Sequence, residues 1–238
     1  MIELKDGAIF VADVHYHLGV REEFEKFLRE FDSDQLVLMG DIFDLLVGEV
    51  EYTIKQNQKI IDLLNDLSQK IPIIYMEGNH DFQLKKLFPA ILVVPIQKQP
   101  LILKYNSKKI ALAHGDNFES KSYNFYSNII RNRYLLKILN FIDLISSNGI
   151  SKKILFEQKK KKFCKKNKYF KKFAKQKLKI YDIATNRFDL ICEGHYHIDA
   201  TFEFESMKYK FFASYACDGS YYKLMNNSEE IVFNHLKD

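Results

Sequence analysis

Residues 72–81 read PIIYMEGNHD, an apolar run that ends directly in polar side chains. Such a run predicts a buried β-strand, with the polar residues at its carboxyl end. The same pattern is present in AIFVADVH (8–15) and in QLVLMGD (35–41). Residues 21–31 and 54–70 lie between these strands and carry apolar side chains at helical spacing. The first half of the chain therefore alternates strands with helices, which predicts a layered βαβ core.

The second half of the chain is richer in strands. Residues 101–116 read as a hairpin with Asn106 and Ser107 at its bend. Four more strands are expected after residue 187, in FDLICEGHYH (188–197), TFEFES (201–206), KYKFFAS (208–214) and EEIVFNHL (229–236). Most of them alternate apolar and polar residues, which adds antiparallel pairing to the core.

Residues 120–186 break this rhythm and read as long helices. The net charge of +5 is distributed unevenly, because residues 151–179 contain 14 lysines and one acid, Glu157. This segment therefore carries +13, and the rest of the chain carries −8. A basic segment within an acidic body indicates an anionic partner, such as nucleic acid, a nucleotide or a membrane surface.

Several classes of protein are excluded by composition. The hydrophobic fraction of 47% argues against disorder. The N-terminus has no apolar leader, and no uncharged run reaches the roughly 18–20 residues of a membrane span. The three cysteines, Cys164, Cys192 and Cys217, form no CxxC pair, so we expect neither a disulfide framework nor a zinc knuckle, and a reduced cytoplasmic setting.

Polar side chains follow each predicted strand of the core. They are Asp13 and His15, Asp41, Asn79 and His80, His114, and His195 and His197. The carboxyl ends of strands in α/β sheets are where such proteins place their sites. Carboxylates and imidazoles without a thiolate favour Mn, Fe, Zn or Mg. A carboxylate such as Asp41 has two oxygens and can bridge two ions about 3.5–4 Å apart, an arrangement that suits in-line displacement at phosphorus.

These motifs together resemble those of the calcineurin-like metallophosphoesterases. The matching stretches are D-x-H at 13–15, G-D-x-x-D at 40–44, G-N-H-D at 78–81, H-G-D at 114–116 and G-H-x-H at 194–197. The resemblance implies an α/β (α+β) fold, a four-layer αββα sandwich of two mixed sheets. Residues 1–119 and 187–238 would form the core, and residues 120–186 a helical, lysine-rich lid insertion.

The resemblance also implies roles for the polar residues. One divalent ion would be held by Asp13, His15, Asp41 and His197, and a second by Asp41, Asn79, His114 and His195. His80 would lie beside the phosphate as proton donor or charge stabiliser, so that His80 and Asp41 are the catalytic residues. Asn79, His80 and His195 would contact substrate. His17 matches no motif and is expected on the rim of the site, and His235 is expected at the surface or in packing.

The insertion bears on the choice of phosphate ester. In residues 134–145 only Lys137, Asn140 and Asp143 are polar, so the helix is apolar nearly all round. Residues 152–179 place phenylalanines and a leucine near one face, with lysines elsewhere. A basic amphipathic helix beside an apolar one suits an anionic membrane surface or a groove for acyl chains. Two alternatives are a helical pair with a solvated lysine face, and a nucleic-acid clamp in which Phe163, Tyr169 and Phe170 stack bases.

The whole chain is also similar to the UDP-2,3-diacylglucosamine pyrophosphatases of lipid A synthesis. That similarity implies Mn as the metal and a lipid-linked nucleotide sugar as substrate, cleaved to UMP and 2,3-diacylglucosamine 1-phosphate. It implies a cytoplasmic protein at the anionic inner-leaflet surface, with no nucleic acid as partner. The chain departs from that group at His80, where many members carry Arg, and at GHYHID (194–199). The alternatives are a soluble metallophosphodiesterase or nuclease and, in a third class, a non-catalytic metal-holding scaffold.

Overall fold

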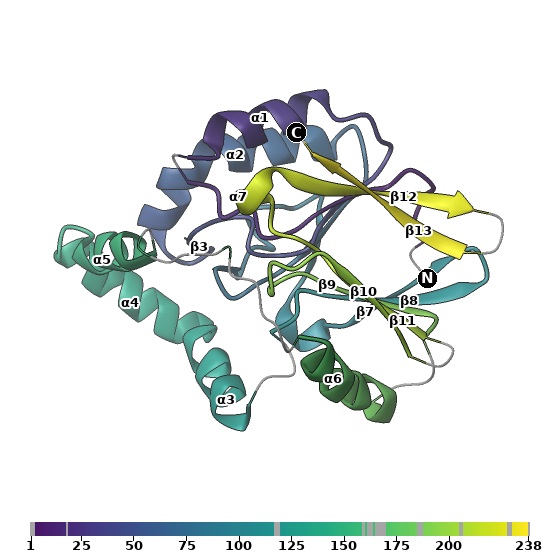
Figure 1. Cartoon of the computed structure of the whole chain (residues 1–238). Coiled ribbons are helices and arrows are strands. Elements are labelled where there is room, and N and C mark those ends of the chain that lie inside the picture. The colour runs from purple at the N-terminus through teal and green to yellow at the C-terminus, as the bar shows by residue number, and fades with distance from the viewer. Residues whose placement is uncertain are drawn as a thin grey trace.

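Two mixed β-sheets face each other in the computed structural model (Figure 1). The structure describes residues 3–17, 19–116, 120–158, 160, 164, 170–184, 188–204, 207–227 and 230–237. The first sheet has the strand order β13-β12-β1-β2-β4-β6. Its strands are β1 (Ile9–Val11), β2 (Leu36–Leu38), β4 (Ile73–Met76), β6 (Leu92–Val94), β12 (Ser220–Asn227) and β13 (Glu230–Lys237). The strands β1, β2, β4 and β6 are parallel, and β12 and β13 add antiparallel pairs.

The second sheet has the order β10-β11-β9-β8-β7. Its strands are β7 (Leu101–Tyr105), β8 (Lys108–Ala113), β9 (Leu190–Glu193), β10 (Ala200–Phe204) and β11 (Met207–Phe211). The parallel pairs β8–β9 and β9–β11 lie between antiparallel pairs at both edges. A third, two-stranded sheet joins β3 (Leu46–Val47) to β5 (Asp81–Phe82), and a short 3-10 helix, η1 (Ile96–Lys98), precedes β7.

Strand alternation divides the core between two apolar layers. Phe10 and Val37 point into the space between the sheets, whereas their neighbours Ile9 and Leu38 pack under helices on the outer face of the first sheet. Those helices are α1 (Arg21–Glu30) and α2 (Glu51–Ser68), and the short α7 (Tyr215–Asp218) adds Tyr215 to the same layer. Burial of this layer is the main source of stability for both helices.

The outer face of the second sheet is covered by α6 (Phe170–Ala184). Phe170, Ala174 and Tyr181 of α6 are buried against Ile191 and Phe211 of the sheet. The layers are therefore helix, sheet, sheet and helix, which confirms the predicted four-layer sandwich. Although α6 lies inside the range predicted as the insertion, it forms the fourth layer. The insertion boundaries at 120 and 186 remain a prediction.

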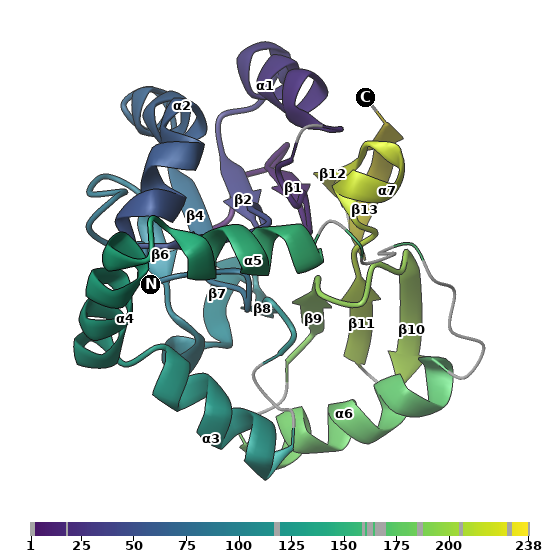
Figure 2. The ribbon, with the colours of Figure 1, turned by 90° about the vertical axis from the view of Figure 1, so that its left-hand side faces the viewer.

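Three further helices stand outside the sandwich along one side (Figures 1 and 2). They are α3 (Lys121–Ile130), α4 (Arg133–Ile145) and α5 (Gly149–Gln158), and together they are called the arm below. Leu136 of α4 is buried with Val47, Val50 and Phe82, which anchors the arm on the small third sheet. Among the described residues, no helix is both long and apolar enough to cross a membrane.

The expectation that the cysteines stay unpaired is wrong for two of them. Cys164 forms a disulfide with Cys217 of α7, whereas Cys192 is free and buried in β9. The two bonded residues are 53 positions apart in sequence, so no spacing pattern reveals the pair. The disulfide ties the segment that follows the arm to the sandwich.

Candidate metal centre

The predicted ligands come from five separate loops and meet at one edge of the two sheets. Three groups have potential ligand atoms within 4.8 Å of one another. They are Asp13, His15 and His197; His15, Asp41 and His80; and Asp41, His114 and His195. Asp41 is thus shared between two groups. The structure brings together all the predicted metal ligands and His80, because Asn79 Oδ1 also lies 3.3 Å from His114 Nε2.

The distances between these atoms are those of ligands that surround a cation. His15 Nε2 lies 3.4 Å from His197 Nε2, and His197 Nε2 lies 3.4 Å from Asp13 Oδ1. On the other side, His114 Nε2 lies 3.4 Å from Asp41 Oδ2 and 3.2 Å from His195 Nδ1. At metal–ligand distances of about 2.1 Å, ligands of one tetrahedral or octahedral shell lie roughly 3.0–3.4 Å apart. In addition, Asp13 Oδ1 is buried and has no hydrogen-bond partner among the described residues. The donor set therefore fits two divalent ions.

The backbone is strained at these positions. Asp13, His15, Asp41, His195 and His197 all have φ between 45° and 65°, in the left-handed region that non-glycine residues rarely adopt. Each such residue costs on the order of 1 kcal/mol or more, and such strain clusters at functional sites. The sharp turns aim side chains from neighbouring strands toward the same point.

Two glycines leave room for the ligands. A Cβ atom on Gly78 would lie 2.2 Å from Asp41 Oδ1, and one on Gly40, whose φ is +91°, would lie 2.4 Å from His114 Nδ1. Both distances are shorter than atoms tolerate. The G-D and G-N-H-D motifs therefore need glycine for close approach of one loop to the ligands of another.

Backbone carbonyls orient two of the imidazoles. His114 Nδ1 lies 2.9 Å from the Met39 carbonyl, and His80 Nδ1 lies 2.8 Å from the Asp44 carbonyl. Because a carbonyl oxygen only accepts, Nδ1 carries the proton in both rings. The Nε2 atom of His114 then points toward Asp41 and Asn79 and is the atom that a metal would bind, as in metal-binding histidines whose other nitrogen is held by a second group.

Burial and neighbouring charges set the protonation states of the proposed ligands. Burial lowers the pKa of His15 to about 3 and that of His195 to about 4, so both rings are neutral near pH 7. Burial opposes ionisation of Asp41, but His114 and His80 outweigh it and hold the Asp41 pKa well below its ordinary value. Burial lowers the pKa of His114, but the charge of Asp41 outweighs it and raises that pKa well above its ordinary value. Asp41 is therefore a carboxylate paired with a protonated His114, and a bound cation would replace that proton.

Sequence reasoning missed the role of Asp81. Its Oδ2 accepts from the Ile42 amide at 2.6 Å and from the Tyr75 hydroxyl at 2.5 Å, and its Oδ1 accepts from the Gly78 amide at 2.9 Å. This buried carboxylate ties the loop after β2 to the loop after β4. The last position of G-N-H-D therefore positions the two loops that carry Asp41 and Asn79.

A buried lysine supports the opposite side of the centre. Lys177 of α6 is 3% exposed, and its Nζ contacts the Gly115 carbonyl, the Tyr196 hydroxyl and Glu193 Oε2. Gly115 follows His114, and Tyr196 stands between His195 and His197. Lys177 is one of the run of lysines that the sequence assigned to an anionic partner or, as an alternative, to a solvated face, so only its place on the buried side of α6 reveals its role.

The two remaining histidines lie outside the cluster. His17 donates from Nδ1 to the His15 carbonyl at 2.6 Å, and the chain turns at this point, because the Val20 amide bonds to the His17 carbonyl. His235 stacks on Tyr222 and lies 3.0 Å from Asp199. The packing role predicted for His235 agrees with these contacts.

Residues 8–199 match the family model described as calcineurin-like phosphoesterase. The chain belongs to this family. Its members use divalent metals, and the cluster above supplies the candidate ligands. The mixed sheets and their helical layers are consistent with the family fold.

Curated relatives of this family member are named UDP-2,3-diacylglucosamine hydrolase. One from Ralstonia nicotianae is 31% identical over 121 residues, 48% of this chain and 45% of that protein. One from Psychromonas ingrahamii is 26% identical over 165 residues, 66% of this chain and 67% of that protein. The chain thus spans about half the length of the first of these and about two thirds of the second. Among solved structures, the phosphoesterase YfcE from E. coli is similar at 13% identity with a TM-score of 0.47, covering 96% of this chain and 97% of that one.

Proposed function

We propose that this phosphoesterase is a dinuclear-metal hydrolase that cleaves the pyrophosphate of UDP-2,3-diacylglucosamine to UMP and 2,3-diacylglucosamine 1-phosphate. The family membership and the names of the curated relatives support a phosphoester substrate of this type. The observation that carries the lipid part of the proposal is the orientation of α4 in the arm.

Two residues of the narrow polar stripe of α4 face inward, Asn140 toward the body of the protein and Asp143 toward α5, whereas Lys137 is exposed. Asn140 Oδ1 accepts a hydrogen bond from the Glu51 amide at the start of α2, at 2.9 Å. Asp143 is 2% exposed and accepts from the Ile150 and Ser151 amides at the start of α5. Both side chains cap a neighbouring helix, and together with the buried Leu136 they fix this side of α4 inward.

The apolar side of the arm consequently faces outward. Its exposed residues are Phe125, Tyr126, Ile129, Tyr134, Ile138, Phe141, Ile142, Leu144 and Ile145, called the apolar face below. Exposed apolar patches of this kind mark sites for partners, ligands or membranes. We assign the apolar face to the acyl chains of the substrate and to the bilayer that holds them.

Exposed lysines accompany the apolar face. Lys152, Lys153 and Lys160 lie on or just after α5, and Lys171, Lys172 and Lys175 are exposed on α6. In the proposal these lysines are attracted to the anionic inner leaflet, and this attraction weakens as the salt concentration rises. Phe163 and Tyr169, and the lysines of 159–168 other than Lys160, lie outside the described residues.

The chain's own residues have separate tasks in the proposed reaction. Asp13, His15, Asp41 and His197 would hold one ion, and Asp41, Asn79, His114 and His195 the other. When bound, the ions, with Mn as the proposed metal, activate water and neutralise charge on the phosphoryl oxygens. His80 donates from its backbone amide to Asp41 Oδ1 at 2.8 Å and from Nδ1 to the Asp44 carbonyl. Its Nε2 therefore donates to the phosphate or the leaving group only when the ring is doubly protonated.

A substrate panel tests the proposal. The Mn-loaded protein is assayed with UDP-2,3-diacylglucosamine, a bis-aryl phosphodiester, cyclic nucleotides and single-stranded DNA at equal phosphorus concentration. The proposal predicts the highest kcat/KM for the lipid substrate. A preference for DNA or cyclic nucleotides would instead establish a soluble phosphodiesterase or nuclease.

A further inference from the structure

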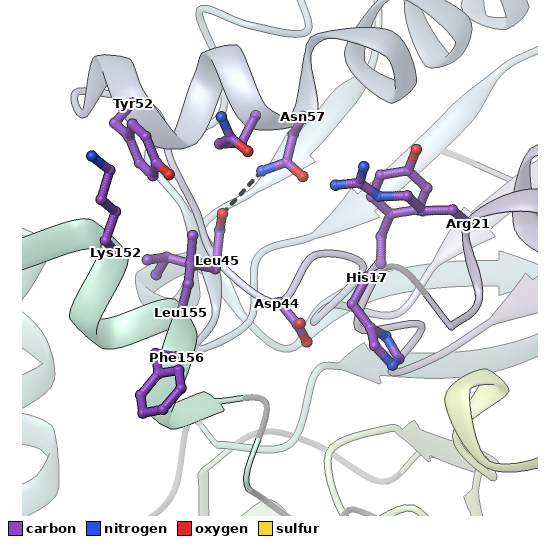
Figure 3. A pocket seen from close by; sticks show the side chains of 11 residues that line it. His17, Arg21, Asp44, Leu45, Tyr52, Asn57, Lys152, Leu155 and Phe156 are labelled. Atoms are coloured by element: carbon purple, nitrogen blue, oxygen red, sulfur yellow. Dashed lines mark hydrogen bonds between the residues drawn. The ribbon is translucent and has the colours of Figure 1, made fainter. Parts of the chain in front are cut away.

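A cavity of about 360 Å³ lies between α5 and the turn that precedes α1 (Figure 3). Its lining residues are Tyr16, His17, Arg21, Asp44, Leu45, Tyr52, Gln56, Asn57, Lys152, Leu155 and Phe156. None of them belongs to the proposed ligand set. A cavity of this size is within the range of small-molecule sites.

The cavity adjoins the metal centre. Asp44 Oδ1 lies 3.8 Å from His15 Nδ1, and the Asp44 carbonyl accepts from His80. His17, which also lines the cavity, is bonded to the His15 carbonyl. A molecule whose phosphate lies at the centre therefore has this cavity next to it for its other part.

The lining combines polar and apolar surface. Only Leu45, Leu155 and Phe156 carry no polar atom in their side chains. An acyl chain there would remove Arg21, Asp44 and Lys152 from water without offering any hydrogen bond in return. The apolar face of the arm is a better match for acyl chains, so the cavity suits a ligand that is itself planar, polar and anionic.

Three features match such a ligand. Tyr52 and Phe156 present aromatic rings on the α5 side, and Lys152 Nζ lies 5.9 Å from the centre of the Tyr52 ring (Figure 3). Asn57 donates to the Leu45 and Thr53 carbonyls, and among the described residues no hydrogen bond reaches its Oδ1. Arg21 Nε is buried and without a hydrogen-bond partner within the described part of the chain. The cavity thus offers stacking surfaces, an acceptor, and cations.

We propose that this cavity binds the nucleoside of the substrate, with the base beside Tyr52 and Phe156 and its phosphate toward the metal centre. The ligand class is a pyrimidine nucleoside monophosphate, and the assignment rests on the proposed function. Tyr52 supplies the stacking surface, Asn57 and Gln56 meet the polar edge of the base, and Lys152 Nζ donates to a carbonyl oxygen of the base. In this arrangement α5 separates the nucleotide part of the substrate from its lipid part.

Binding of UMP to the full, Mn-loaded chain tests the assignment, measured by isothermal titration calorimetry. Tyr52→Ala is expected to weaken UMP binding roughly 10-fold or more, the effect of removing one base-stacking ring. Tyr52→Phe, which keeps the ring, is expected to bind like the parent. Lys152→Ala is expected to weaken UMP binding severalfold. The matched control is Lys153→Ala, a change at an exposed neighbouring lysine, which is expected to leave UMP binding unchanged. Inorganic phosphate is expected to bind Tyr52→Ala and the parent equally, and the melting temperature of each variant reports on folding.

The outcomes separate this inference from the proposed function. UMP affinity unchanged in Tyr52→Ala, or equal losses in Lys152→Ala and Lys153→Ala, overturns the inference. Decanoate that displaces UMP and loses affinity in Tyr52→Ala would also overturn it, because the cavity would then hold an acyl chain. If UMP follows the expected pattern but UDP-2,3-diacylglucosamine is not cleaved, the nucleotide site stands and the lipid substrate is wrong. If that substrate is cleaved but UMP affinity is unchanged in Tyr52→Ala, the proposed function stands and the nucleotide site is wrong.

Discussion

The apolar face of the arm gives a prediction whose size follows from the structure. Phe141 and Ile145 lie one turn apart on α4 and are 65% and 71% exposed. Full burial of such a side chain contributes about 1.5–3 kcal/mol, so the exposed two thirds of each can still contribute about 1–2 kcal/mol at a membrane. The pair Phe141→Ser with Ile145→Ser should therefore lose about 2–4 kcal/mol of membrane affinity, roughly 30- to 700-fold.

Sedimentation with vesicles that contain anionic lipid measures this loss. KM for UDP-2,3-diacylglucosamine should rise with it, whereas kcat/KM for a small bis-aryl diester should change less than twofold because the metal ligands are untouched. A matched control, Ile102→Ser with Val232→Ser, removes exposed apolar side chains from β7 and β13, far from the arm in sequence. Vesicle affinity of the arm variant within threefold of the parent would refute the membrane role.

Three further predictions concern the centre and its supports. His15→Ala should lose bound metal and activity, whereas His17→Ala should keep both ions by metal analysis, and loss of an ion from His17→Ala would show that the first histidine pair supplies two ligands. Chelation with EDTA should lower the melting temperature in calorimetry, since ions at 100 times their Kd stabilise the folded state by about 2.7 kcal/mol; an unchanged melting temperature speaks against binding to the native fold. Lys177→Met should lower the free energy of unfolding by about 3 kcal/mol, because Glu193 loses its buried partner, whereas the exposed Lys175→Met should change it by less than about 0.5 kcal/mol in urea titrations. Equal effects of the two lysine changes would contradict the assigned contact.

The sandwich and the members of the candidate site could be predicted from sequence because the end of each core strand is marked by a change from apolar to polar residues. The runs before Asp13, Asp41 and Asn79 are buried apolar strands, and each run is followed at once by side chains that can bind a metal. Parallel strands then bring those ends to one edge of the sheet. The prediction needed no knowledge of side-chain contacts.

Among the described strands, β3, β5, β6 and β12 escaped prediction, and β3 and β5 have only two residues each. The edge strand β6 has only three residues and lies in the apolar run AILVV (90–94), but prolines at 89 and 95 flank the run and it shows no alternation. By contrast, β12 does carry a signal, because Tyr222 and Leu224 are both fully buried at a spacing of two. The polar residues on either side, among them Lys223 and Asn226, made this alternation hard to recognise in the sequence.

The place of α6 could not be read from charge alone. Its buried residues Phe170, Ala174, Lys177 and Tyr181 recur at helical spacing, but lysines surround them and one lysine is a member of the stripe. The buried partners of Lys177 come from β9 and from the loops after β8 and β9, and no local pattern links those segments. The same applies to Asp81, whose hydrogen bonds join two distant loops, and to the Cys164–Cys217 disulfide.

The central claim is a two-ion centre organised around Asp41, and metal content measured alongside hydrolysis tests it most directly. The parent chain and Asp41→Asn are loaded with Mn, freed of excess metal, and analysed by plasma mass spectrometry while their rates on a bis-aryl diester are recorded. The account predicts two ions per chain in the parent, at most one in Asp41→Asn, and a rate at least about a thousandfold lower in the variant. Two ions in Asp41→Asn together with a near-parent rate would contradict it.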